Sequence, residues 1–374
     1  MRRLLVLILL GLTGTASANV LPEDRTDMLF KMYDGGGATI GGPSILVRKQ
    51  VAKDISVVAN YYIDAVSSAS IDVVTTASPY TERREQWSVG MDYLRGGTTM
   101  SMNYVTSLES DFDAKTYALG IQQTLLGQLT TISLNYSYGE DIVGRSDDET
   151  FARENIRQQY GIGITQIITK HLIAALNIET VTDEGFLNNP YRTVRYLDPG
   201  SAIGYSYEPE LYPNTRTSNA VGFRAKYYLP YRAAIEGEYR YFTDTWGIEG
   251  HTASVSYTQP WNKWIFNVKL RSHDQTGASF FRDLFSRSEA TNFRGRDKEL
   301  SPLTSNTVRL KASYEFLNNP AGWLKRGAVT ASIDHLMVDY EEFRDLRVRG
   351  GNVGEEPLYS LDANVVQFWV SFWY

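Results

Sequence analysis

The sequence predicts an all-β fold, a transmembrane antiparallel up-and-down β-barrel of sixteen strands. Three observations lead to this prediction: a strictly alternating strand at the carboxyl terminus, an amphipathic aromatic composition without long apolar segments, and a secretory signal at the amino terminus. Fourteen or eighteen strands remain open, because the first strand has the weakest pattern.

The last residues of the chain alternate with a period of two from Val366 onward. Apolar side chains take one face, and the other face carries Gln367, Ser371 and two indoles. A soluble strand of this kind would leave a large apolar surface uncovered, whereas lipid would cover it. The segment resembles the closing strand of bacterial outer-membrane barrels. We therefore expect it to hold a signal for the barrel-assembly machinery, formed by Phe368, Val370, Phe372 and Tyr374.

The amino terminus predicts export. Arg2 and Arg3 precede an apolar run that ends at Leu12, and Ala16-Ser17-Ala18 supplies small residues for cleavage. We interpret residues 1–18 as a cleaved signal peptide and residues 19–374 as the barrel, since the apolar run is too short to span a membrane as a helix. The chain has no cysteine, which excludes disulfides and thiolate chemistry.

Composition favours the same class. The chain has 25 Tyr, 15 Phe and 7 Trp, yet its mean hydropathy is −0.30. Such a composition suits the aromatic girdles of a membrane barrel. Removal of residues 1–18, with two arginines and no acid, changes the net charge from −6 to −8, which argues against a nucleic-acid partner. No linker divides the chain, so we expect one domain.

Alternation recurs along almost the whole chain, and the connections alternate between short and long. Short ones are expected near Ala52, Gly96, Gly127, Thr169, Pro230, Pro260 and Asn319. Longer ones are expected at 66–82, 140–155, 183–216, 275–304 and 340–361, with brief exceptions at 108–113 and 243–248. Short periplasmic turns and long outer loops are typical of membrane barrels. A soluble sandwich or propeller is the alternative, but no blade-length repeat appears.

The inward positions are unusually charged in the second half of the chain. Mixed signs on neighbouring strands predict cross-strand ion pairs. These residues either select solutes by charge or only brace a hydrated wall. The candidates are Arg224, Lys226, Glu236, Glu238, Arg240, Lys269, Arg271, Arg309, Lys311 and Glu315. The inward positions of the first half of the chain carry fewer charges.

The segment Asp183–Arg216 is rich in tyrosine and proline, which predicts an ordered loop. It could form a constriction or a lid, with its arginines pairing with Glu236 and Glu238, or it could lie as a packed surface loop. The candidate residues are Tyr191, Arg192, Arg195, Tyr196, Tyr212 and Arg216.

A family resemblance rests on several strings of the sequence. They include LNNPYR (187–192), YYLPYR (227–232), WGIEGHT (246–252) and RDKELS (296–301). With these strings the chain resembles a family of Gram-negative outer-membrane barrels catalogued as a domain of unknown function. The resemblance implies a barrel in the outer membrane, encoded near periplasmic thioredoxin-like and flavin-transfer proteins. It implies no catalytic residue and no cofactor.

No constellation for catalysis emerges from the sequence. His251 and His273 begin and end one expected hairpin, but their parity places them on opposite faces, which argues against a joint metal site. We therefore expect no enzyme activity, no metal and no cofactor.

The leading hypothesis is an outer-membrane channel for small hydrophilic solutes or ions. The alternative is a barrel that docks periplasmic redox or lipoprotein components, and an enzyme at the barrel rim is third. The expected partners are membrane lipid, the barrel-assembly machinery and small solutes, with periplasmic redox proteins under the alternative.

Overall fold

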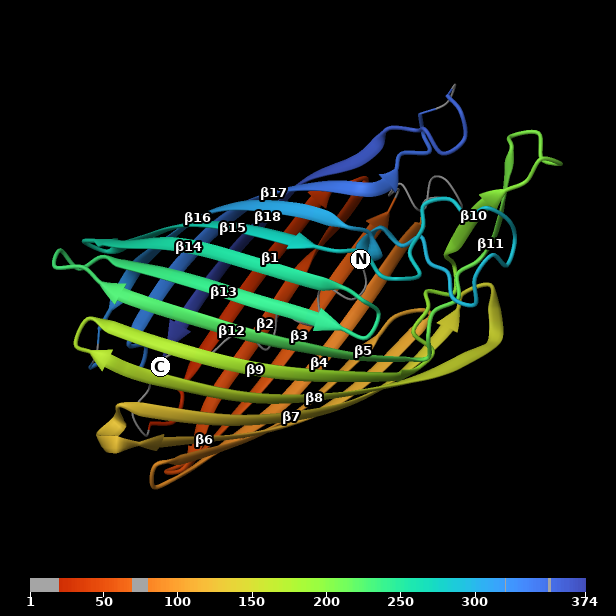
Figure 1. Ribbon diagram of the computed structural model, residues 1–374. Helices are drawn as coiled ribbons and strands as arrows, with labels where there is room; N and C mark the ends of the chain where they lie inside the picture. The colour runs from red at the N-terminus through yellow and green to blue at the C-terminus, as the bar shows by residue number, and fades with distance from the viewer. Residues whose placement is uncertain (1–19, 69–79, 320, 349–350) are drawn as a thin grey trace.

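The computed structural model describes residues 20–68, 80–319, 321–348 and 351–374. Both the predicted signal peptide and most of the predicted connection 66–82 lie outside these residues. Sixteen strands form a closed antiparallel barrel, as the sequence predicts, with β1 hydrogen-bonded to β18 (Figure 1). A further pair, β10 and β11, forms a small separate sheet.

The first nine barrel strands are β1 (Arg25–Gly35), β2 (Ala38–Ala52), β3 (Ile55–Ser68), β4 (Tyr80–Arg95), β5 (Thr98–Leu108), β6 (Phe112–Leu125), β7 (Thr130–Arg145), β8 (Asp148–Thr169) and β9 (Leu172–Gly185). The separate sheet consists of β10 (Thr193–Leu197) and β11 (Tyr205–Pro209). The remaining barrel strands are β12 (Thr215–Tyr228), β13 (Ala234–Asp244), β14 (Glu249–Trp261), β15 (Trp264–Gln275), β16 (Leu303–Asn318), β17 (Arg326–Arg344) and β18 (Leu358–Trp373).

The two ends of the barrel differ. Short turns gather at the end where β1 begins and β18 finishes, for example Gly96–Gly97 between β4 and β5, where Gly96 has a φ of 60°. The opposite end carries the longest connections, 186–214, 276–302 and 345–357, and there β10 and β11 project from the barrel (Figure 1). Short turns on the periplasmic side and long loops outside are the usual arrangement.

An apolar band surrounds the outer wall. Outward side chains such as Phe30, Val89 and Leu119 are about half exposed, which water would not favour but lipid does. Aromatic pairs flank this band: Tyr104 contacts Tyr117 toward the long-loop end, and Trp264 contacts Tyr314 at the short-turn end. Aromatic girdles at the two interfaces are expected of a membrane barrel.

The predicted long loop at 140–155 is wrong. β7 and β8 run through this region and meet at a turn of two residues, 146–147. Glu140 and Glu154, inside the predicted loop, are outward residues of strands that continue above the aromatic girdle, and Lys115 of β6 lies opposite Glu140. Strand pairing therefore extends beyond the apolar band on this side.

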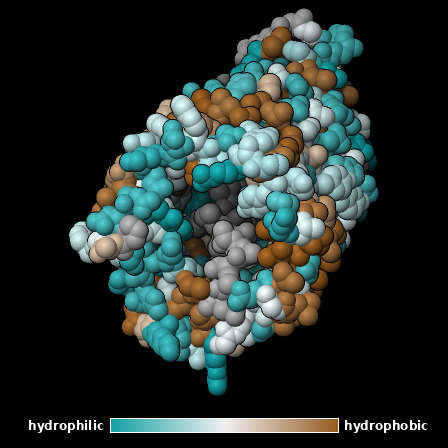
Figure 2. Space-filling model, turned by 90° about the vertical axis from the view of Figure 1, so that its left-hand side faces the viewer, coloured by the Kyte–Doolittle hydropathy of each residue, from teal (hydrophilic) through white to brown (hydrophobic). Residues whose placement is uncertain are grey.

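The end that carries the short turns is hollowed at its centre, and hydrophilic residues gather around much of the rim (Figure 2). Among the residues that the structure describes, no helix has the length and apolarity to cross a membrane.

Candidate functional site

The inner wall from β12 to β17 carries a ladder of charged side chains. The predicted cross-strand ion pairs are formed, because antiparallel pairing places inward residues of neighbouring strands opposite each other. Arg224 lies 3.2 Å from Glu238, and Lys269 reaches the same carboxylate at 3.3 Å. The other pairs are Lys226 with Glu236 at 3.5 Å, Arg240 with Glu179 at 3.7 Å, and Arg309 with Asp334 at 2.5 Å.

Three of the ten candidate lumen residues stand apart from this ladder. Within the described parts of the chain, Arg271, Lys311 and Glu315 form no ion pair. Arg271 lies opposite Ser254 of β14, and Lys311 opposite Asn267 of β15. Glu315 lies near the short-turn end, beside a register shift in β16. Two cations, Arg271 and Lys311, and one carboxylate, Glu315, therefore lie outside the ion pairs of the ladder.

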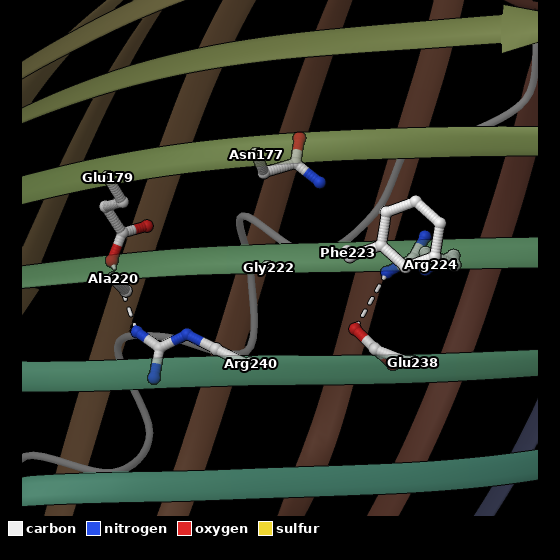
Figure 3. Close-up of a pocket in the computed structure, with 8 residues that line it drawn as sticks. All are labelled: Asn177, Glu179, Ala220, Gly222, Phe223, Arg224, Glu238 and Arg240. Carbon is white, nitrogen blue, oxygen red and sulfur yellow. Dashed lines mark hydrogen bonds and ion pairs between the residues drawn. The ribbon is translucent and has the colours of Figure 1, made fainter.

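A recess opens in this wall at Gly222 (Figure 3). Gly222 lies between Asn177 of β9 and Arg240 of β13, and it contributes no side chain to the lumen. The two ion pairs Arg240–Glu179 and Arg224–Glu238 flank the recess on either side (Figure 3). Sequence reasoning missed this recess, although a glycine at an inward position is the signal that could have revealed it.

The inner wall from β5 to β9 is lined mostly by small and uncharged residues, and the charged exceptions include Asp141, Arg157, Glu179 and Asp183. Representative pairs across its strands are Ser101 with Gly120, Ser133 with Gly163 and Asn135 with Gly161. Long charged side chains therefore occupy one side of the lumen and short polar ones another. This agrees with the milder first half expected from the sequence for β5 to β9, whereas β2 and β4 carry an inward ion pair, Arg48 with Asp92.

The outer mouth holds a folded cap, by which we mean residues 186–214 and 276–302 with the described part of 345–357. Its apolar core packs onto the inner faces of β16, β17 and β18. Phe281 and Phe343 are almost fully buried, and the Tyr212 ring contacts both Trp246 and Phe280. The cap is thus a packed unit seated in the mouth.

A buried ionic network ties the three cap segments together. Arg195 is fully buried and donates to both carboxylate oxygens of Glu356, at 2.7 and 2.9 Å. It also pairs with Asp283, whose other carboxylate oxygen accepts from Arg296 at 3.0 Å. Planar guanidinium groups suit such bidentate contacts. Residues from all three segments therefore meet at one charged centre.

The predicted pairing of the loop arginines with Glu236 and Glu238 is wrong. Arg192 pairs with Asp297, Arg195 with Asp283 and Glu356, and Arg216 with Asp244 at 2.5 Å. These carboxylates come from other outer segments and from the end of β13. They could not be identified from the sequence because their partners are distant along the chain.

The remaining loop candidates also contact neighbouring outer segments. Tyr191 donates its hydroxyl to Asp111 at 2.6 Å, and Tyr196 forms a parallel bridge with Phe285. Tyr212 is buried and hydrogen-bonds to Glu210. Burial raises the pKa of Glu210 to about 7, and it raises the pKa of Tyr212 well above its usual value.

The histidines take opposite faces, as predicted. His251 pairs in register with Asp274, whereas Thr252 pairs with His273. The His251 imidazole contacts the Tyr239 hydroxyl at 2.7 Å, and His273 contacts Thr252 at 2.8 Å. In the described parts of the chain, no group of three or more acidic or histidine side chains could hold a metal ion.

A family model described as "Protein of unknown function (DUF3570)" matches residues 34–322. The chain belongs to this family. No curated protein sequence matches it. The closed barrel with its apolar outer band makes it a β-barrel of a bacterial outer membrane, since closure leaves no unpaired strand edge in lipid.

Several solved outer-membrane proteins have a similar outline at low identity. The siderophore receptor PirA from Pseudomonas aeruginosa is 11% identical with a TM-score of 0.46, over 94% of this chain and 63% of that one. A bacterial polysaccharide outer membrane secretin is 6% identical with a TM-score of 0.49, over 95% and 100%. OccAB3 from Acinetobacter baumannii is 8% identical with a TM-score of 0.44, over 94% and 99%. This chain spans 63% of the length of the siderophore receptor.

Proposed function

We propose that this barrel is a channel for small hydrophilic solutes and that it prefers anions over cations. The observation that carries the preference is the pair of lumen cations, Arg271 and Lys311, which no described carboxylate neutralises. Fixed charge on a channel wall raises the local concentration of ions of the opposite sign. The remaining ladder pairs five cations with four carboxylates, because Arg224 and Lys269 share Glu238, and the resulting positive charge is offset by Glu315, which has no ion-pair partner in the described chain.

The small-residue wall supports a solute path. Short side chains such as Ser101, Ser133 and Asn135 leave room beside the charged ladder and offer hydrogen bonds to a hydrated solute. The cap would narrow the outer mouth, because it packs onto the inner faces of β16 to β18. The cap segment 186–214 then acts as part of a constriction. Docking of periplasmic redox components remains the alternative.

The test is ion selectivity in a planar bilayer under a salt gradient. We expect ohmic conductance and a reversal potential that indicates anion preference. A double variant, Arg271→Gln with Lys311→Gln, should reduce the anion-to-cation permeability ratio about two- to fivefold, since each solvated charge contributes about 0–1 kcal/mol. Neither change removes a cation from a described ion pair, whereas substitution of Lys226 would take away the cation that pairs with Glu236.

The matched control removes two positive charges outside the lumen. Lys170 and Lys263 lie in short turns and are exposed, so Lys170→Gln with Lys263→Gln should leave the ratio within the error of the wild type. Absence of conductance in the wild type would contradict the channel proposal and favour docking. An equal shift in both double variants would place the selective charge outside the lumen.

A further inference from the structure

The recess at Gly222 has the size of a small solute. A Cβ atom built on Gly222 would meet no other heavy atom within 4 Å. The recess has a volume of about 110 Å³. The adjacent inward residue on the same strand is Ala220, so no long side chain projects from this part of β12 into the lumen (Figure 3).

The two carboxylates at the recess are already engaged. Glu238 accepts from Arg224 and Lys269, and the Ser254 hydroxyl contacts it at 3.4 Å. Glu179 accepts from the Gln159 amide at 3.0 Å and pairs with Arg240. A solute cation would therefore have to compete with positive groups of the protein for both carboxylates.

Hydrogen-bond donors, in contrast, remain available. The Nε atom of Arg224 is buried and has no hydrogen-bond partner among the described residues. Arg271 shares a row with Glu238 and Ser254 across three strands, and in the structure described it forms no ion pair. The Arg240 guanidinium lines the recess and lies 3.7 Å from Glu179, beyond hydrogen-bond distance, so its N–H groups can donate to an anionic ligand.

We propose that the Gly222 recess binds a small organic anion through its carboxylate groups, as a step in passage through the lumen. This inference rests on the channel function proposed above and names the solute class. Arg224 and Arg240 line the recess and supply positive charge, Arg271 adds to the field from β15 beyond the recess, and Gly222 supplies the space. Glu179 and Glu238 hold the arginine side chains in position.

Calorimetric titration of the detergent-solubilised barrel tests the site without reference to transport. The probes are succinate, its neutral diamide and 1,4-diaminobutane, which share a four-carbon chain and differ in charge. We expect saturable binding of succinate only. Gly222→Leu fills the recess without changing charge and should weaken succinate binding at least about tenfold, because the ligand loses its space.

Gly237→Leu is the matched control for added volume. Gly237 lies on the adjacent strand, and a Cβ there also meets nothing within 4 Å. It shares its parity with the outward residues Ile235 and Tyr239, so succinate binding should stay unchanged. Heat-modifiable migration on a gel checks that both variants form the barrel.

Charge is tested by a second matched pair. Arg271→Gln should weaken succinate binding about fivefold. Lys311→Gln removes the same charge at a different place in the wall. Arg271 lies opposite Thr307 of β16, and Lys311 lies four positions further along β16, about 13 Å from Thr307. It should change the affinity less than about twofold.

The outcomes separate this inference from the channel function. A wild-type barrel that conducts but binds no succinate overturns the recess and leaves the channel standing. Binding without conductance supports the recess and contradicts the channel. Equal succinate affinity in Gly222→Leu and wild type, or equal binding of 1,4-diaminobutane, overturns the inference directly.

Discussion

At the residue scale, single buried charges decide how the cap is held. Arg195 is fully buried between Asp283 and Glu356, and the latter pairing is bidentate. Contact with two carboxylates raises the pKa of Arg195 further above its usual value, although burial opposes this. A guanidinium in this setting stays charged, so its two partners depend on it.

Arg195→Met should destabilise the cap by about 3–5 kcal/mol, because Glu356 would remain without a cation and Asp283 would keep only Arg296 as its cation. Amide hydrogen exchange of residues 276–302 measures this local opening, while heat-modifiable migration should stay as in the wild type. Arg347→Met is the control, since Arg347 pairs with Asp345 at 2.6 Å on the surface and should cost less than about 1 kcal/mol. Equal exchange in both variants would contradict the role assigned to Arg195.

Glu210 gives the cap a pH dependence. Its pKa is raised to about 7, mainly by burial, although Arg192, the Tyr212 hydroxyl and the Arg296 amide favour the ionised form, and Asp297 opposes it. The folded cap therefore binds a proton more tightly than the unfolded chain, whose carboxyl titrates near 4.5. The contribution of Glu210 to stability is present below pH 4.5 and is lost as pH rises through about 7.

We expect hydrogen exchange in the cap to be slower at pH 5.5 than at pH 8, after correction for the intrinsic exchange rate. Glu210→Gln should remove most of this difference and slow exchange at pH 8, because a neutral side chain carries no desolvation cost of ionisation. If the variant keeps the full difference in exchange rate between pH 5.5 and pH 8, a group other than Glu210 causes the pH dependence.

At the element scale, the tyrosine- and proline-rich segment is one part of a three-part cap. β10 and β11 pair with each other, and Leu211 bridges to Arg294 in the 276–302 segment. The barrel strands on either side, β9 and β12, pair directly with each other, from Leu172 opposite Tyr227 to Glu184 opposite Thr215. The wall therefore does not depend on the segment that connects them.

Replacement of residues 186–211 by a short Gly/Ser linker should leave barrel assembly largely intact, since β9 and β12 keep their hydrogen bonds. We expect single-channel conductance to increase, because the segment contributes to the packed mouth. The control shortens only the exposed tip, replacing 199–203 by Asn-Gly, and should leave conductance unchanged. Equal conductance in all three proteins would place the segment outside the solute path.

At the scale of the whole molecule, closure brings the two ends of the chain together. β1 pairs with β18 from Arg25 to Gly35, and the Tyr374 amide donates to the Asp24 carbonyl at 3.2 Å. The Tyr374 hydroxyl donates to the Arg48 carbonyl at 3.2 Å, and the Lys49 ammonium lies 5.0 Å from its ring. The terminal tyrosine therefore contacts both strands of the first hairpin at the seam.

Deletion of Phe372 to Tyr374 should leave export intact and stop barrel assembly, because β18 loses both its predicted assembly signal and its seam contacts. Outer-membrane fractionation and heat-modifiable migration report the result. Tyr374→Phe keeps the aromatic ring and loses only hydroxyl contacts, so it should assemble with a stability lower by about 1 kcal/mol. Normal assembly of the truncated chain would show that the terminal strand is dispensable.

The sequence alone determined the barrel wall. A period of two fixes which side chains face lipid and which face the lumen, and antiparallel neighbours then bring charges such as Arg224 and Glu238 together. The opposed faces of His251 and His273 and the cross-strand pairs follow from this local rule, whereas closure between β1 and β18 decided the count of sixteen among the alternatives. The same rule did not predict that the strands continue through 140–155. Charged outward residues are found both in loops and in strand that extends above the membrane, so the pattern there fits either structure.

Only the tertiary structure decided the cap and the recess. The partners of Arg195 lie 88 and 161 residues away in the chain, so no local spacing identifies Asp283 or Glu356. The recess at Gly222 depends on what β9 and β13 place beside a missing side chain. Alternation is a property of one strand and can be read from sequence. A buried ion network or a cavity depends on which distant segments meet, and that is set by the closure of the barrel and the packing of its loops.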